Sequence, residues 1–154
     1  MSSIKTYFDI YGESHQNSIN KLIHWFCVPL IFFSIIWLTY FIKLTFLNSL
    51  IPNYLCNLAF VIILFGVIFY LYYSIQIAIG MFLFSILNYY IIFSISNANF
   101  EILPVLIFLF SWIFQLIGHK IEGKKPSFLE DIFFLMIGPA WLLSFIYDKI
   151  GIKY

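Results

Sequence analysis

The chain has 154 residues, of which 63% are hydrophobic and only 10% are charged. A domain of this size cannot bury so many apolar side chains, because small domains keep much of their surface exposed, and the composition therefore predicts an integral membrane protein. The net charge of +1, with no arginine in the chain, excludes nucleic-acid binding, which depends on clustered cations that neutralise phosphates.

The first 24 residues combine scattered charges with a helical apolar pattern and contain no continuous apolar run. They are therefore not a cleavable signal peptide, which needs such a run. The apolar side chains recur at helical spacing, at Ile4, Tyr7, Phe8 and Tyr11. This pattern predicts a short amphipathic helix that lies in the membrane interface.

Four apolar segments follow that are long enough, or nearly so, to cross a bilayer, which takes about 20 residues. They cover residues 25–42, 54–73, 75–95 and 102–118. A fifth run, residues 132–146, is interrupted by Gly138-Pro139, and it either spans poorly, re-enters the membrane or packs against the bundle. The expected fold is thus all-α: a polytopic helical bundle of four spans, a short fifth apolar helix and the N-terminal amphipathic helix, forming one membrane domain over residues 1–154.

All three histidines of the chain are expected at one membrane face. Four crossings separate His15 and His24 from His119, and an even number of crossings returns the chain to the same side. Most lysines fall on that face too, which makes it cytoplasmic by the positive-inside rule. The membrane is the inner one for a bacterial source and the endoplasmic reticulum for a eukaryotic one.

Imidazoles that converge beside a carboxylate can hold Fe, Zn, Cu or Ni. Glu122 follows His119 by three residues and could complete such a site, while Asn20 and Gln115 could hydrogen-bond the ligating rings. Lys120 and Lys124 could steer a substrate carboxylate. Each feature also has a simpler interpretation: histidines cap helix ends or bind lipid headgroups, Glu122 pairs with a neighbouring lysine, and the lysines only set the topology.

Two polar motifs give the chain a family resemblance. The first, at His15–Pro29, reads H-Q-N-x-x-N-K-L-I-H-W-x-x-x-P, and the second, at Trp112–Pro126, reads W-I-F-Q-L-I-G-H-K-I-E-G-K-K-P. Together with the hydrophobic plan between them, they resemble a membrane family whose characterised fungal member is the 2-hydroxy fatty acid dioxygenase of phytosphingosine breakdown. The likeness covers nearly the whole chain.

The resemblance implies an Fe(II)-dependent α-oxidation that uses O₂ to shorten a long-chain 2-hydroxy fatty acid by one carbon, within membrane lipids. It implies that His15, His24 and His119 bind the iron, with Glu122 as a further catalytic or metal-binding residue. Two departures stand out: Gln16 replaces a second histidine beside the first, and one residue fewer separates His119 from Glu122.

Two other classes of function remain open from the residues themselves. A haem-binding electron carrier would use two of the histidines as axial ligands. A non-enzymatic scaffold or lipid-binding protein would agree with the lack of charge deep in the spans, where transporters usually keep ionisable groups. Membrane di-iron enzymes need about eight histidines, and this chain has three.

Overall fold

The computed structural model describes residues 4–96, 101–125 and 133–154, and within these ranges it is all-helical, as predicted. The helices are α1 (Ile4–Glu13), α2 (Ser18–Tyr40), α3 (Leu58–Tyr73), α4 (Ile75–Ile95), α5 (Leu103–Glu122) and α6 (Phe133–Ile150). Two short 3₁₀ turns, Thr45–Leu47 and Asn53–Leu55, lie in the connection between α2 and α3.

Capping residues explain where several helices begin. Asn17 accepts hydrogen bonds from the backbone N–H groups of Ile19 and Asn20, so α2 starts well before the apolar run. Ser74 is in an extended conformation and caps α4 through the N–H of Ile77. It therefore separates α3 from α4 without a glycine or proline.

The set of long apolar helices differs in two places from the sequence prediction. Four helices are long and apolar enough to cross a membrane: α2, α4, α5 and α6. The segment predicted over 54–73 forms only the 16-residue α3, because a 3₁₀ turn precedes it and Asn57 caps it through the N–H of Phe60. The run over 132–146 extends instead to Ile150 and accommodates Pro139 within an 18-residue helix.

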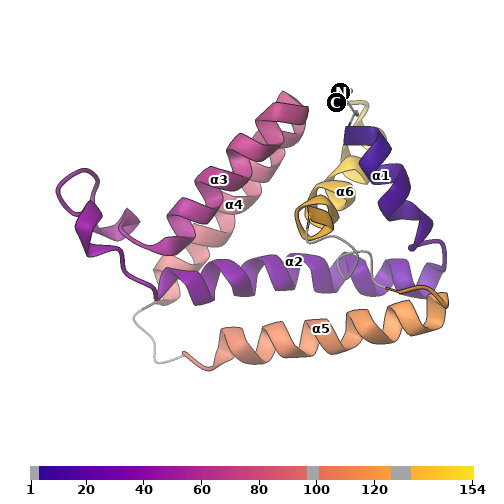
Figure 1. Ribbon diagram of the computed structural model, residues 1–154, viewed down its shortest axis with the longest axis horizontal. Coiled ribbons are helices and arrows are strands. Elements are labelled where there is room, and N and C mark those ends of the chain that lie inside the picture. Colours follow the sequence, from indigo (N-terminus) through magenta and orange to yellow (C-terminus); the bar gives the residue numbers. More distant parts are fainter. Residues whose placement is uncertain (1–3, 97–100, 126–132) are drawn as a thin grey trace.

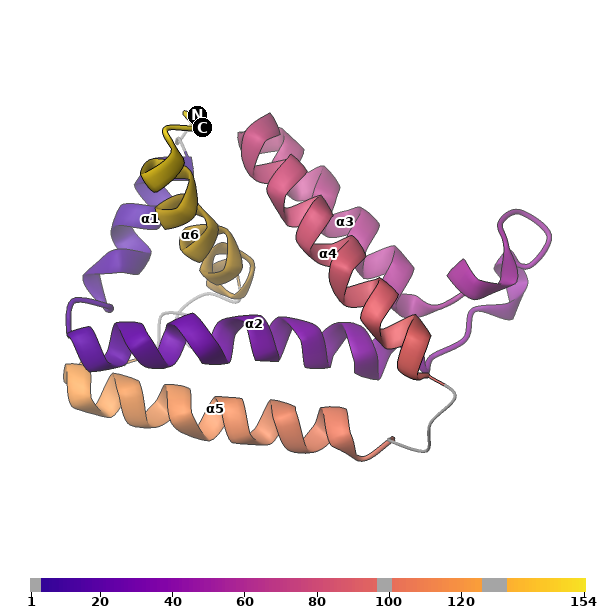
Figure 2. The ribbon, with the colours of Figure 1, turned by 180° about the vertical axis from the view of Figure 1, so that it is seen from behind.

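The helices form a long antiparallel pair with two smaller groups on it (Figures 1 and 2). α2 and α5 lie side by side along their whole length, so the start of α2 meets the end of α5. The α3–α4 hairpin extends obliquely from the C-terminal end of α2. Helices α1 and α6 lie over the N-terminal half of α2. One core cluster joins α1, α4 and α6, and a second joins α2 to the base of the hairpin.

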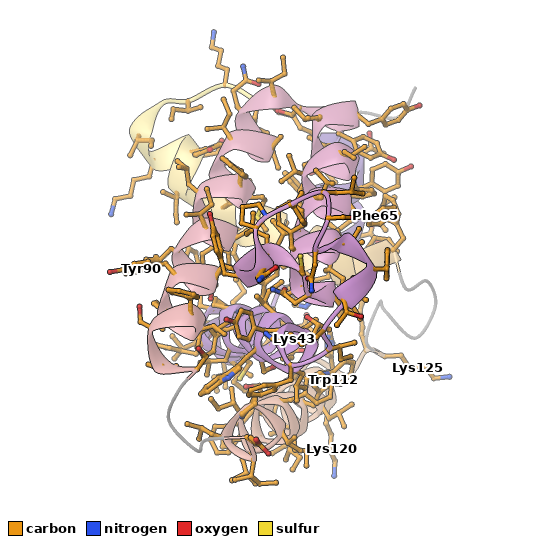
Figure 3. The ribbon with its side chains drawn as sticks, turned by 90° about the vertical axis from the view of Figure 1, so that its left-hand side faces the viewer. Lys43, Phe65, Tyr90, Trp112, Lys120 and Lys125 are labelled. Carbon is orange, nitrogen blue, oxygen red and sulfur yellow. The ribbon has the colours of Figure 1, made fainter. Side chains whose placement is uncertain are left out.

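The outer surface is apolar, as a lipid-facing surface must be. Large side chains such as Phe65 and Tyr90 are 65% and 67% exposed, and Figure 3 shows such side chains along the outside of α3 and α4. A protein in water rarely exposes apolar patches of this extent. The four apolar helices and this surface together indicate a membrane protein.

Candidate metal centre

Three histidines meet where the start of α2 faces the end of α5. His15 lies in the turn between α1 and α2, His24 in α2, and His119 in the last turns of α5. Their side chains are 0%, 1% and 3% exposed. Each ring has one nitrogen that could bind a metal, and these three nitrogens lie within 4.8 Å of one another. The structure thus brings together the three histidines that the sequence analysis expects close to one another.

The three rings are packed closely and almost perpendicular to one another. The ring centroids of His15 and His24 are 4.2 Å apart, those of His15 and His119 are 5.0 Å apart, and those of His24 and His119 are 4.9 Å apart. The interplanar angles are 83°, 73° and 81°. No two of these rings are stacked face to face, and the space between them suits a single ion.

Backbone carbonyls select the tautomer of two of the rings. Nδ1 of His15 is 2.6 Å from the carbonyl oxygen of Tyr11, and Nδ1 of His24 is 2.9 Å from that of Asn20. A carbonyl only accepts hydrogen bonds, so each Nδ1 carries the proton and each Nε2 keeps its lone pair. Ligating histidines are commonly oriented by this kind of hydrogen bond on the other ring nitrogen.

Two ring nitrogens of the cluster are buried without a hydrogen-bond partner among the described residues. They are Nε2 of His15 and Nδ1 of His119. An unsatisfied buried polar atom costs about 1–3 kcal/mol, and a metal ion among these nitrogens would remove that cost. Neutral imidazoles suit Fe, Zn, Cu and Ni, so the residues present fit a first-row transition metal.

Burial also keeps His15 in the form that a metal requires. Loss of solvation lowers the pKa of His15 to about 4, against a smaller opposing effect of its hydrogen bond to the Tyr11 carbonyl. The ring is therefore neutral at physiological pH, and metal binding needs no proton release from it.

The same shift predicts how the metal-free protein responds to acid. Unfolded His15 takes up a proton near pH 6.5, whereas the folded ring does so only near pH 4. The unfolded state therefore binds more protons between these values, and stability falls as the pH falls through this window, with about 3 kcal/mol of the loss due to His15. Thermal unfolding of the metal-free protein from pH 7 to pH 4 should show this loss, and His15→Gln should flatten the profile. An equally steep profile in that variant would contradict the assignment.

Glu122 ties the end of α5 to the turn that carries His15. Its two carboxylate oxygens accept hydrogen bonds from the backbone N–H groups of Gln16 and Asn17, at 2.8 Å each. The side-chain amide of Asn20 donates a third, at 3.1 Å. The sequence presents Glu122 as a possible ligand, whereas the described group of converging ligand atoms holds only the three histidines. The hydrogen bonds of Glu122 attach the end of α5 to the turn between α1 and α2 and to Asn20.

Asn20 and Gln115 both lie near the histidines, and Asn20 is the more closely connected. Asn20 is fully buried, donates to the carbonyl of Ser14 as well as to Glu122, and offers its own carbonyl to His24. Gln115 is 5% exposed and lines a cavity of about 50 Å³ between α2, α5 and α6. The contact to His24 uses the backbone carbonyl of Asn20, so a role of the Asn20 side chain beside a ligating ring stays a prediction.

Gly118 allows α5 to approach Asn20. A Cβ atom at residue 118 would overlap Asn20 Oδ1, and the Asn20 side chain is buried and held by two hydrogen bonds. Gly118→Ala should therefore destabilise the protein by about 1–3 kcal/mol, through displaced helices or lost hydrogen bonds. Thermal unfolding in detergent measures this loss. Gly12→Ala is the control, since its Cβ meets only Trp141 Nε1 at 3.7 Å; equal effects would refute the close-approach argument.

Neither of the two lysines suggested for a substrate carboxylate lines the open cavity that reaches His15. Lys124 Nζ donates to the carbonyl of Glu13 at 2.8 Å, and Lys120 is exposed and points outward in Figure 3. This polar cavity of about 530 Å³ lies between α1 and α6, and its lining includes Lys5 and Lys21 instead.

Two aromatic neighbours of His15 were not identified as site residues from the sequence. The ring of Tyr11 is stacked on His15 at 4.2 Å and 16°, and Trp141 of α6 lies 5.3 Å from it. The sequence offers a signal for Tyr11, which precedes His15 by one helical turn. It offers none for Trp141, because that residue lies in a separate helix.

Comparisons with known proteins give one match. The model of a family described as 2-hydroxy-palmitic acid dioxygenase, Mpo1-like, matches residues 1–150. No curated protein and no solved structure matches the chain.

Proposed function

The chain belongs to the Mpo1-like family of 2-hydroxy-palmitic acid dioxygenases, and on that basis we propose that its three histidines bind one Fe(II) ion for the α-oxidation of long-chain 2-hydroxy fatty acids. The observation that carries the proposal is the buried cluster of His15, His24 and His119, whose ligand nitrogens lie within 4.8 Å of one another. Iron bound there would supply the redox chemistry that O₂ requires.

The reaction balances with the substrate and O₂ alone. A 2-hydroxy acid and one O₂ give the acid one carbon shorter, CO₂ and water, as the bond between C1 and C2 breaks. The substrate supplies all four electrons, so neither 2-oxoglutarate nor a reductase is needed. A small membrane protein without a nucleotide-binding motif suits such chemistry.

The residues around the histidines have three tasks in this proposal. The carbonyls of Tyr11 and Asn20 hold two rings with Nε2 toward the ion. The burial of the rings excludes bulk water, and the polar cavity beside His15 gives the carboxylate and hydroxyl of a substrate a route to the centre. The exposed apolar faces of the helices leave the acyl tail in lipid. We place this end of the protein at the cytoplasmic face of the bacterial inner membrane or the endoplasmic reticulum.

The packing of the rings favours a single ion over haem. Two axial histidines place their nitrogens about 4 Å apart on opposite sides of a flat macrocycle, which holds the rings well apart. Here three ring centroids lie only 4.2–5.0 Å from one another. These distances leave no slot for a porphyrin between any pair.

The decisive experiment uses the full-length protein, purified in detergent and loaded with Fe(II). With O₂ and 2-hydroxypalmitate as the only additions, we expect formation of the acid one carbon shorter together with CO₂. Palmitate and 3-hydroxypalmitate, which lack the α-hydroxyl group, serve as matched controls and should not react. Failure to form the shortened acid with iron bound would overturn the proposed reaction, and a Soret band in the purified protein would favour the haem alternative.

A further inference from the structure

Tyr11 is held in a narrow slot between His15 and α6. One face of its ring is stacked on the imidazole of His15, with centroids 4.2 Å apart and an interplanar angle of 16°. Trp141 of α6 packs edge-on against it at 5.2 Å. The side chain is only 7% exposed, so the ring has little freedom to move away from either neighbour.

Tyr11 contacts His15 in two independent ways. Its ring supports the imidazole face, and its backbone carbonyl accepts the Nδ1–H hydrogen bond at 2.6 Å. The position of Tyr11 therefore sets both the plane of the His15 ring and the direction in which Nε2 points. A displacement of the phenol ring would be passed on to this nitrogen.

Gly138 of α6 leaves room for the hydroxyl group of Tyr11 because it has no side chain. A Cβ atom built at Gly138 would lie 3.0 Å from the hydroxyl oxygen of Tyr11, 3.5 Å from its Cζ and 3.7 Å from Cγ1 of Val28. Only the first of these distances is shorter than ordinary van der Waals contact. The hydroxyl group is therefore the single atom of Tyr11 that a methyl group at residue 138 would push.

We propose that Tyr11 and Gly138 are positioning residues for the metal centre. Because residue 138 of α6 has no side chain, the Tyr11 ring can occupy its observed position, and Tyr11 in turn sets the position of the ligand nitrogen of His15. The inference rests on the proposed iron site, and it adds that a helix without any ligand controls the metal affinity. Neither residue belongs to the group of three histidines whose ligand atoms converge.

The rescue by Tyr11→Phe separates this role from a purely structural one. Gly138 precedes Pro139 within α6, and proline disfavours the helical conformation of a preceding residue that carries a Cβ, so Gly138→Ala has a cost in stability that does not depend on Tyr11. A purely structural role for Gly138 would leave the loss of metal affinity unchanged when Tyr11 is also replaced by Phe. The positioning role makes the affinity return while that cost in stability remains.

The test measures binding of Fe(II), and of Co(II) as a spectroscopic probe, to the full-length protein in detergent. We expect Gly138→Ala to weaken binding by about 10-fold, in the range found when groups that orient ligands are altered. Tyr11→Phe alone should leave binding within about twofold of the parent, because the ring and the backbone carbonyl remain. Combining the two changes should restore binding, since the nearest atom to the new methyl group is then Cζ at 3.5 Å.

Gly66→Ala is the matched control, because it is also a glycine-to-alanine change within an apolar helix and its Cβ meets only Cε of Met136 at 3.6 Å. It should not alter metal binding. If Gly138→Ala does not fold, Tyr11→Leu removes the stacked ring instead, and it should weaken binding by about the same factor.

The outcomes distinguish this inference from the proposed function. Unchanged affinity in Gly138→Ala, or a loss that Tyr11→Phe does not restore, would overturn the positioning role and leave the iron site intact. A parent protein that binds neither Fe(II) nor Co(II) would overturn both. Metal binding with the expected pattern but no α-oxidation would overturn only the proposed reaction.

Discussion

His119→Ala should lower the affinity for iron by more than about 100-fold, since changes to groups that merely orient a ligand already cost 10–100-fold. The variant removes the ligand contributed by α5 and leaves His15 and His24 on the other side of the site. It should remain folded and inserted, because the long α2–α5 contact and the turn at Gly123 do not depend on this ring. Metal analysis of the purified variant and titration with Fe(II) measure the loss.

Asn88→Ala is a suitable control for this experiment. Asn88 is also a buried polar residue of a long apolar helix, at 6% exposure, and its amide donates only to the carbonyl of Phe84 on the same helix. Its replacement should leave the iron content unchanged. Stoichiometric iron in His119→Ala would rule out the three-histidine site.

Glu122→Ala should destabilise the metal-free protein by about 2–4 kcal/mol, because hydrogen bonds to a charged group contribute about 1.5–3 kcal/mol each and water can replace some of them. The change removes the acceptor for the N–H groups of Gln16 and Asn17 and for the buried amide of Asn20. The turn that carries His15 then loses its attachment to α5, and iron affinity should fall by about 10–100-fold. Thermal unfolding without metal and Fe(II) titration measure the two effects separately.

The two measurements also show whether Glu122 holds the His15 turn by hydrogen bonds or binds the metal itself. Loss of iron without loss of stability in the metal-free protein would identify Glu122 as a ligand instead. Glu122→Gln keeps one acceptor oxygen and should have an intermediate effect on stability. Glu13→Ala is the control, because Glu13 is exposed and its interaction with Lys124 uses the backbone carbonyl, which alanine retains.

Hydropathy was sufficient to predict that the chain is all-helical, with several long apolar helices. Long apolar runs dictate helices in a membrane, since every backbone polar group must be satisfied there. The parity of crossings predicted that His119 lies near His15 and His24, and the described structure does bring these three residues together. The count of spans behind that prediction differs, because three of the four long apolar helices of the described residues, α2, α4 and α5, connect the two ends of the site; the membrane face of the histidines stays a prediction.

The contacts that support the histidines could not be predicted in this way. Helical spacing places Glu122 one turn after His119, but only the packing of α5 against α2 shows that its carboxylate reaches the N–H groups of Gln16 and Asn17. The extent of α3 was misjudged because Asn57 caps a helix inside what reads as one continuous apolar run. Hydrophobicity alone does not distinguish a helix from the turn before it.

The antiparallel pairing of α2 with α5 has a consequence for how the protein is made. His119 follows His24 by 95 positions, and at about 5–20 residues per second the ribosome needs on the order of 5–20 s to synthesise this stretch. During that interval the nascent chain carries only two of the three histidines that we propose as iron ligands. In the proposed site, tight metal binding would therefore follow the synthesis of α5.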